Sequence, residues 1–85
     1  MSNIDNVIAL YLDKASRFIQ DGGGMCYWAY TVLQTVDLML SERPDMERSK
    51  MHRQLRIRHA ELMVRCWDEI GKLEVQNMKD AGYEE

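Results

Sequence analysis

The sequence is poor in the residues that interrupt helices, because it holds a single proline and five glycines among 85 residues. It also lacks any alternating, β-branched run of strand length. These two shortages exclude folds built on sheets, which need both strands and the turns between them. Leu, Met, Ala, Glu, Lys, Arg and Gln dominate the composition instead, and these residues favour helices. We therefore predict an all-α protein.

Cysteine is scarce as well, with only Cys26 and Cys66 in the chain. A small secreted domain held together by disulfides usually carries more cysteines than this. Both residues lie inside helical apolar patterns, where a free cysteine behaves as a small hydrophobic side chain. We expect two reduced, buried thiols in a cytoplasmic protein.

No hydrophobic run is long enough to indicate a membrane span. The longest run, residues 25–40, covers 16 residues and is broken by Gln34 and Asp37, whereas a span needs about 20 apolar residues. The N-terminal stretch carries Asp5 and lacks the basic region that begins a secretory signal. These absences favour a cytoplasmic chain that does not enter a membrane.

An excess of positive charge is also absent. The net charge is −3, so the whole molecule is not a general binder of polyanions. Hydrophobic residues make up 46% and charged residues 29% of the chain, a balance typical of globular rather than disordered proteins. At this length we expect one helical domain, residues 1–85.

Apolar periodicity predicts a helical hairpin at the start of the chain. The first helix begins after a cap at Ser2 or Asn3 and ends at Asp21 and Gly22. The second helix covers about residues 25–40. The apolar stripe of the first helix consists of Ile4, Val7, Ile8, Tyr11, Ala15, Phe18 and Ile19.

The third predicted helix is the longest. It begins near Asp45, because Pro44 disfavours helix before it and suits the first turn of the helix that follows. It continues to residue 79 or 80, and Gly82 is its expected terminator. Gly71 lies inside this helix, and a kink or an early end at that position stays open.

Three adjacent glycines, residues 22–24, separate the first two predicted helices. A phosphate-binding loop needs a strand before its glycines and a Lys-Ser or Lys-Thr pair after them. This cluster follows a helix and leads into Met-Cys-Tyr-Trp. Glycine adopts without strain the left-handed conformation wanted just past a helix end. We therefore interpret the cluster as the turn of the hairpin.

The second predicted helix has an unusual outer side. Its expected core face consists of Met25, Ala29, Val32, Leu33, Val36, Met39 and Leu40. The opposite side carries none of the lysines and glutamates of an ordinary exposed face. A helix that is uncharged all round is usually buried on both sides. We therefore predict self-association through the residues of that side, which are Tyr27, Thr31, Gln34 and Leu38.

The length of the third helix supports the same prediction. It is expected to be about 50 Å long, and each helix of the hairpin about 24 Å, at 1.5 Å per residue. One hairpin cannot cover it, whereas a second copy can. We expect a homo-oligomeric helical bundle, a dimer or a tetramer, in which Leu62 and Trp67 are buried anchors. The residues expected to be partly bare in one subunit are Leu55, Leu62, Met63, Val64, Trp67, Ile70, Leu73 and Val75.

The third helix also divides its charges along its length. Its first part holds five basic residues and no acid between positions 48 and 58, and acids prevail from Asp68 onward. Four interpretations stay open: antiparallel pairing of two long helices, binding of nucleic acid, binding of an acidic partner protein, and a solvated face. The basic residues are Arg48, Lys50, Arg53, Arg56 and Arg58.

We favour a partner protein, because an apolar seam runs beside the basic residues. Met51, Leu55 and His59 form this expected seam, and an apolar core with a charged rim is the usual layout of a protein interface. The predicted partner-binding residues are Lys50, Arg53, Arg56 and His59.

Direct binding of nucleic acid is the main alternative. The stretch RSKMHRQLRIRHAEL is basic and helical, and Arg and Gln read base edges well. A helix-turn-helix, however, needs a short helix and a tight turn before its recognition helix. Here the basic stretch lies inside one long helix that follows an almost purely apolar one, and no aromatic residue interleaves it.

Metal binding and catalysis are not expected, and no cofactor is predicted. His52, His59 and Cys66 share a helix face, but seven residues correspond to about 10.5 Å along a helix, which is too far for one ion. Asp68 and Glu69 are adjacent, so their side chains diverge on a helix and make poor partners for acid–base work. We predict that the protein is not an enzyme.

The segments GGGMCYWAY and RQLRIRHAELMVRCWDEI join an aromatic, Met-rich hairpin to a long arginine-bearing helix. In this general character the chain resembles small regulators encoded by temperate phages, and among them antirepressors. The resemblance implies an oligomer that binds a DNA-binding repressor and keeps it off DNA. This agrees with the uncharged aromatic surface, because Tyr, Trp, Met and Arg are enriched in interface cores. A purely structural assembly protein is the remaining alternative.

Overall fold

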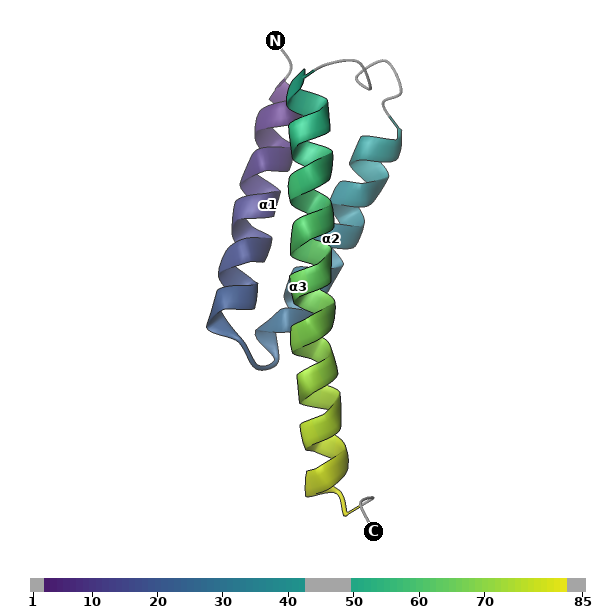
Figure 1. Ribbon diagram of the computed structural model, residues 1–85. Helices are drawn as coiled ribbons and strands as arrows, with labels where there is room; N and C mark the ends of the chain where they lie inside the picture. Colours follow the sequence, from purple (N-terminus) through teal and green to yellow (C-terminus); the bar gives the residue numbers. More distant parts are fainter. Residues whose placement is uncertain (1–2, 43–49, 83–85) are drawn as a thin grey trace.

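The computed structural model describes residues 3–42 and 50–82, and these residues form three helices and no strand. Figure 1 shows an antiparallel hairpin of α1 (Asn3–Asp21) and α2 (Met25–Ser41), with α3 (Lys50–Asp80) packed against both. The predicted all-α fold, with a hairpin and a long third helix, is confirmed. The predicted cap at Ser2, the roles given to Pro44 and Asp45, and the charge of Arg48 lie outside the described residues.

The glycine cluster is the turn between α1 and α2, as predicted. Gly22 and Gly23 have positive φ angles of 75° and 57°. The N–H of Gly22 donates to the carbonyls of Phe18 and Ile19, both at 3.2 Å, so the last turn of α1 closes on it. No heavy atom lies within 4 Å of a Cβ placed at either glycine. The backbone angle, rather than crowding, is therefore what requires glycine here.

α3 continues without a break through Gly71 and ends where the sequence predicts. Gly82 has a φ of 81°, and its N–H donates to the carbonyl of Lys79 at 3.1 Å. This is the left-handed residue that commonly follows the last turn of a helix. The possible kink or early end at Gly71 does not occur.

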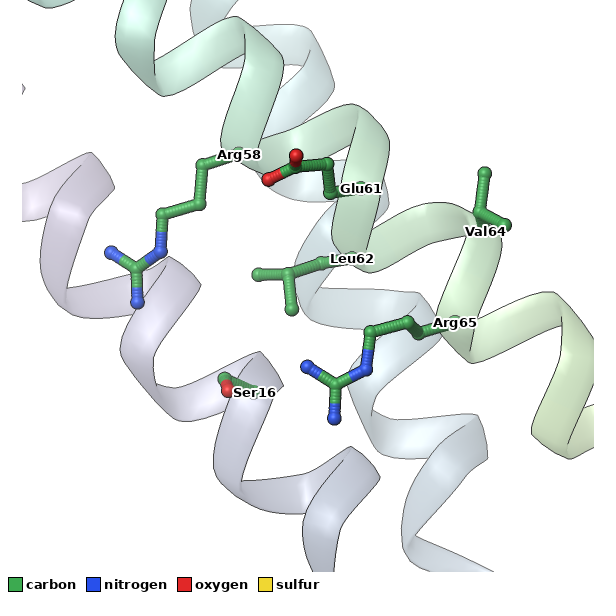
Figure 2. A pocket seen from close by; sticks show the side chains of 6 residues that line it. All are labelled: Ser16, Arg58, Glu61, Leu62, Val64 and Arg65. Carbon is green, nitrogen blue, oxygen red and sulfur yellow. The ribbon is translucent and has the colours of Figure 1, made fainter.

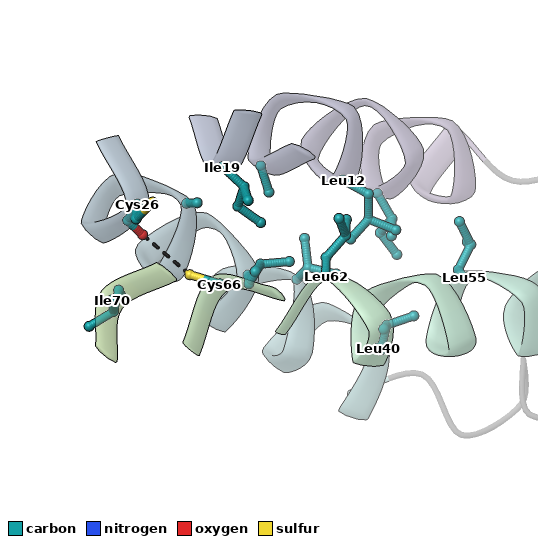
Figure 3. Packing of buried hydrophobic residues seen from close by; sticks show 13 residues of the cluster. Leu12, Ile19, Cys26, Leu40, Leu55, Leu62, Cys66 and Ile70 are labelled. Carbon is teal, nitrogen blue, oxygen red and sulfur yellow. Dashed lines mark hydrogen bonds between the residues drawn. The ribbon is translucent and has the colours of Figure 1, made fainter. Parts of the chain in front are cut away.

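The core lies between the three helices, as Figure 3 shows. α1 turns the stripe formed by Ile8, Leu12, Ala15 and Ile19 inward, and the spacing of three or four residues keeps these side chains on one side. The other helices complete it with Cys26, Ala29, Leu33, Val36 and Leu40 from α2, and Leu55, Leu62, Cys66 and Ile70 from α3.

Two predicted core positions are wrong by one residue. Tyr11 is partly exposed, and Leu12 takes the buried place one turn after Ile8. Met25, the first residue of α2, is likewise exposed, and Cys26 is buried in its place. In each case the buried residue is the next one along the chain, about 100° further around the helix.

α3 extends past the turn of the hairpin, so its C-terminal part has no neighbouring helix in Figure 1. The molecule is correspondingly elongated, with extents of 55 × 19 × 16 Å. The expected overhang is therefore confirmed, but not every residue assigned to it. Leu55, Leu62 and Ile70 are buried, whereas Val64 and Val75 are exposed. None of the described helices combines the length and the hydrophobicity that crossing a bilayer requires.

Candidate interaction surface

The basic residues at the start of α3 do not all face the same way. Lys50, Arg53 and Arg56 are exposed in the first two turns. Arg58 turns toward α1 instead and forms an ion pair with Asp13. We call Lys50, Arg53 and Arg56 the basic ridge. Arg58 has a structural role, because its ion pair links α3 to α1.

The apolar seam predicted beside the basic ridge lies largely inside the subunit. Leu55 is buried in the core, and His59 is half-buried. His59 Nε2 lies 2.8 Å from the carbonyl oxygen of Leu33 on α2, and a ring nitrogen donates its proton in such a contact. His59 therefore links α3 to α2. Its ring contacts its own subunit, and this geometry does not favour the predicted direct contact with a partner. Met51, the third residue of the predicted seam, is exposed, and Ile57 is a second exposed apolar neighbour of the ridge, with 60% of its surface accessible.

The four uncharged residues of α2 are exposed, and two of them, Tyr27 and Gln34, lie at the junction with α3. The Tyr27 hydroxyl donates to Glu74 at 2.7 Å, and this hydrogen bond raises the pKa of Tyr27. Gln34 Nε2 donates to the Tyr30 hydroxyl at 3.0 Å. Thr31 bonds back to the carbonyl of Tyr27 at 3.2 Å, a contact within its own helix. Leu38 is also exposed.

Trp67, predicted as an anchor of self-association, is not buried within the single subunit. Its indole is 54% exposed and packs edge-on against the ring of Tyr30, with ring centroids 5.1 Å apart and planes at 64°. Leu62 is the reverse case, because it is only 5% exposed and belongs to the core of its own subunit. Leu62 is therefore not available for self-association, whereas Trp67 is.

Sequence reasoning missed a second apolar stripe on the outer side of α3. Its large members are among the most exposed hydrophobic side chains of the described residues, and Val64 reaches 70%. Spacing of three and four residues on the face opposite the core was the signal that could have found it. We call this stripe the outer seam; it consists of Ile57, Ala60, Val64, Trp67, Gly71, Val75 and Met78.

An open depression of about 520 Å³ lies on the outer seam, over Gly71. Trp67 and Val75 supply its apolar lining, and Asp68, Lys72 and Gln76 supply its polar lining. Gly71 has no side chain to cover the helix at this point, and no other heavy atom stands within 4 Å of where a Cβ would lie. The depression is open to solvent on an exposed helix, and both apolar and polar side chains line it.

A second depression, of about 570 Å³, lies between α1 and α3. Figure 2 shows Arg58 and Arg65 extending toward α1 on the two sides of Leu62, with Ser16 on the facing helix. Two guanidinium groups could attract an anion. Here Asp13 pairs with Arg58 and Glu61 lines the same depression, so the local charge is balanced and the geometry does not favour an anion site.

The two cysteines are free and buried, and they meet across the α2–α3 contact. The Cys66 thiol donates to the backbone carbonyl of Cys26 at 3.3 Å, the dashed line in Figure 3. Burial raises the pKa of both thiols, which keeps them protonated and poorly nucleophilic. They act as packing residues, as expected from the sequence.

Metal chemistry finds no support in residues 3–42 and 50–82. No group of three or more His, Cys, Asp or Glu side chains within these residues could hold a metal ion. His52 is buried near the start of α3, and Cys66 lies four turns further along the same helix.

No protein-family model, curated protein or solved structure matches the chain. The proposals below therefore rest on the geometry of α2 and α3.

Proposed function

We propose that this protein is a small oligomeric regulator that acts by binding another protein. The observation that carries the proposal is the exposed surface along α3 and the adjoining side of α2. It combines aromatic and aliphatic side chains with the basic ridge at one end. Large exposed apolar patches on small proteins mark sites of interaction.

The composition of this surface favours a protein partner over a nucleic acid. Trp67, Tyr27 and Met78 are of the residue types enriched in the centres of protein interfaces, and arginine is common there as well. A helix that only follows phosphates needs charges and no apolar stripe beside them. By analogy with antirepressors, the partner class we propose is a DNA-binding repressor, occupied through the basic ridge and Ile57.

The exposed ridge of Lys50, Arg53 and Arg56 also favours one alternative, direct binding of nucleic acid. Three cations on consecutive turns could contact a phosphate backbone. The two functions differ in their response to salt, because phosphate contacts release counterions and give a steep decline of affinity as the salt concentration rises.

The first test is affinity capture by the full chain, with charge reversal at Arg53 and Arg56. The double variant Arg53→Glu, Arg56→Glu should lose the captured repressor while its helix content stays unchanged, because both side chains are exposed. The matched control is Lys14→Glu, Arg17→Glu, an exposed pair with the same spacing and charge change on α1. The control should capture its partner like the wild type.

A reconstituted gel-shift assay then tests the action itself. Adding the wild-type chain should release the purified repressor from its operator, and the Arg53, Arg56 variant should not. Equal capture by that variant would contradict the role of the basic ridge. Tight binding of DNA by the wild-type chain alone, falling steeply with salt, would replace the proposal with the alternative.

A further inference from the structure

α3 carries two apolar stripes on different sides. The inner seam contacts α1 and α2 and consists of His52, Leu55, His59, Leu62, Cys66, Ile70 and Leu73. At about 100° per residue, the outer seam is centred about 140° around the helix from it. The members of the outer seam follow one another at intervals of three or four residues, as the contact stripe of a coiled coil does. Within the described residues, α1 and α2 cover the inner seam, whereas the residues of the outer seam are exposed.

We propose that two copies of this chain pair through their outer seams, with the two α3 helices antiparallel and a two-fold axis near residue 69. This inference rests on the self-association within the proposed function and adds its surface, orientation and register. In a two-fold pair each contact occurs twice, and residues equally far from the axis meet. Trp67 then lies opposite Gly71 of the second copy, and Ala60 lies opposite Met78 of the second copy.

The shape of the outer seam supports this register. The depression over Gly71 is open and lined in part by apolar side chains, and in the antiparallel pair each Trp67 enters the depression of the other copy. Ala60 likewise leaves room for the longer Met78. A parallel pair in register would instead set Gly71 against Gly71 and leave the hollow unfilled, which forfeits contacts between the helices.

Charge supports the antiparallel orientation independently of shape. Residues 50–65 hold five lysines and arginines and one acid, whereas residues 66–80 hold four acids and two lysines. With the axis near residue 69, residues 58–65 of one copy lie beside residues 73–80 of the other, so Arg65 comes close to Glu74 of the second copy. Residues 50–57, which include the basic ridge, extend beyond the paired part of α3. A parallel pair would place like charges together, and such juxtaposition disfavours an orientation.

The length of the seam is sufficient for a specific pair. The part of the seam that has counterparts in α3 of the other copy, residues 60–78, covers 19 residues or about 28 Å of helix, close to the three heptads at which such a stripe indicates a coiled coil. Trp67 lies near the centre, where aromatic side chains contribute most to binding. Tyr27 and Gln34 lie at the edge of this surface, through their contacts to Glu74 and to Tyr30, the ring neighbour of Trp67.

The first experiment is sedimentation equilibrium of the full chain at micromolar concentration. The wild type should sediment at twice the mass of the 10.0 kDa chain. Gly71→Leu should raise the dissociation constant by roughly tenfold or more, because the new side chain fills the hollow that receives Trp67. Nothing in the subunit lies near that position, so this variant should keep its helix content.

A second variant and a control make the result specific to the outer seam. Val64→Asp places a charge in the seam and should raise the dissociation constant by roughly a hundredfold. Figure 2 shows Val64 directed away from α1, so this change leaves the core intact. Leu10→Asp is the matched control, an equally exposed aliphatic residue on α1, and should dimerise like the wild type. A wild-type monomer at tens of micromolar, or two seam variants that pair as tightly as the wild type, would overturn the inference.

Cross-linking tests the orientation and the register. An equimolar mixture of Ala60→Cys and Met78→Cys should form a mixed disulfide on oxidation, and neither variant should cross-link with itself. The native thiols of Cys26 and Cys66 are buried. Oxidation of the wild type therefore measures the background of disulfide cross-linking. A parallel pair would produce the opposite pattern, with each variant linked to itself, and that result would overturn the antiparallel arrangement.

These outcomes are separable from those of the proposed function. A dimer that forms through another surface would refute the outer-seam pairing and leave the proposed oligomer standing. A monomer that still captures a repressor through Arg53 and Arg56 would refute self-association and leave the binding function standing. Loss of capture by a well-formed dimer would refute the function alone.

Discussion

Gly22 and Gly71 are chemically identical residues in different backbone conformations. At neither glycine does a heavy atom lie within 4 Å of the place that a Cβ would take, so crowding explains neither of them. Gly22 has a φ of 75° in the turn, where an L-residue is strained, and Gly71 has helical geometry within α3. The difference between them is therefore one of backbone conformation alone.

Exchanging each glycine for alanine should show this difference directly. Gly71→Ala is expected to raise the free energy of unfolding by about 1 kcal/mol, because alanine favours the helix. Gly22→Ala should lower it by about 1 to 2 kcal/mol, the cost of a left-handed residue with a side chain. Urea unfolding of both variants in a Val64→Asp background measures the subunit without its proposed partner. Changes of the same sign would contradict the assigned backbone roles.

At the scale of the helices, the contacts between α3 and the hairpin contribute unequally to stability. Leu62 lies in the core between α1 and α2, and His59 reaches the carbonyl of Leu33. The ion pair of Arg58 with Asp13 is on the surface, where such pairs contribute at most about 1 kcal/mol. Burial of the inner seam, rather than charge, therefore accounts for most of the attachment of α3.

Two truncations on α3 test whether core burial contributes more to stability than surface contacts do. Leu62→Ala should cost about 2–5 kcal/mol of unfolding free energy, because it leaves a cavity in the core. Trp67→Ala should cost about 1 kcal/mol in the monomer, the scale of one edge-to-face aromatic contact. Chemical denaturation of both variants in the Val64→Asp background gives the comparison. If Trp67→Ala costs as much as Leu62→Ala, the indole is a core residue and its exposure has another cause.

At the scale of the whole molecule, the hairpin leaves the C-terminal part of α3 without a neighbouring helix. α3 continues past the hairpin as an isolated helix in Figure 1, and an isolated helix of a few turns is marginal in water. The outer seam runs along both the covered and the overhanging part of α3. Pairing would therefore stabilise the overhang and cover the exposed stripe at once.

Thermal unfolding should consequently depend on protein concentration. A folded dimer that unfolds to separate chains gains stability by mass action as the concentration rises. The wild-type midpoint should increase by several degrees between about 1 and 100 µM, on the scale expected for about 1 kcal/mol in a domain of this size. The Val64→Asp midpoint should stay constant over the same range, and calorimetry distinguishes the two. A constant wild-type midpoint would contradict the paired state.

Most of the fold was predictable because its signals are local. The turn at residues 22–24, the inward stripe through Ile8 and Ala15, and the end of α3 at Gly82 follow from glycine conformation and from apolar spacing. The candidate surface was predicted less well. The chosen side of α2 and the basic ridge are exposed as expected, whereas the outer seam was missed, and Leu62 and His59 contact other helices of their own subunit.

The sequence by itself determined that the chain forms three helices, where the turn lies, and that α3 is too long for its hairpin. Only the tertiary structure decided which apolar residues of α3 face inward. Leu62 and Trp67 both belong to stripes with spacing of three and four residues, so periodicity ranks them equally. The packing of α1 and α2 against one side of α3 buries Leu62 and leaves Trp67 exposed. That choice depends on contacts between distant segments, and no local pattern encodes it.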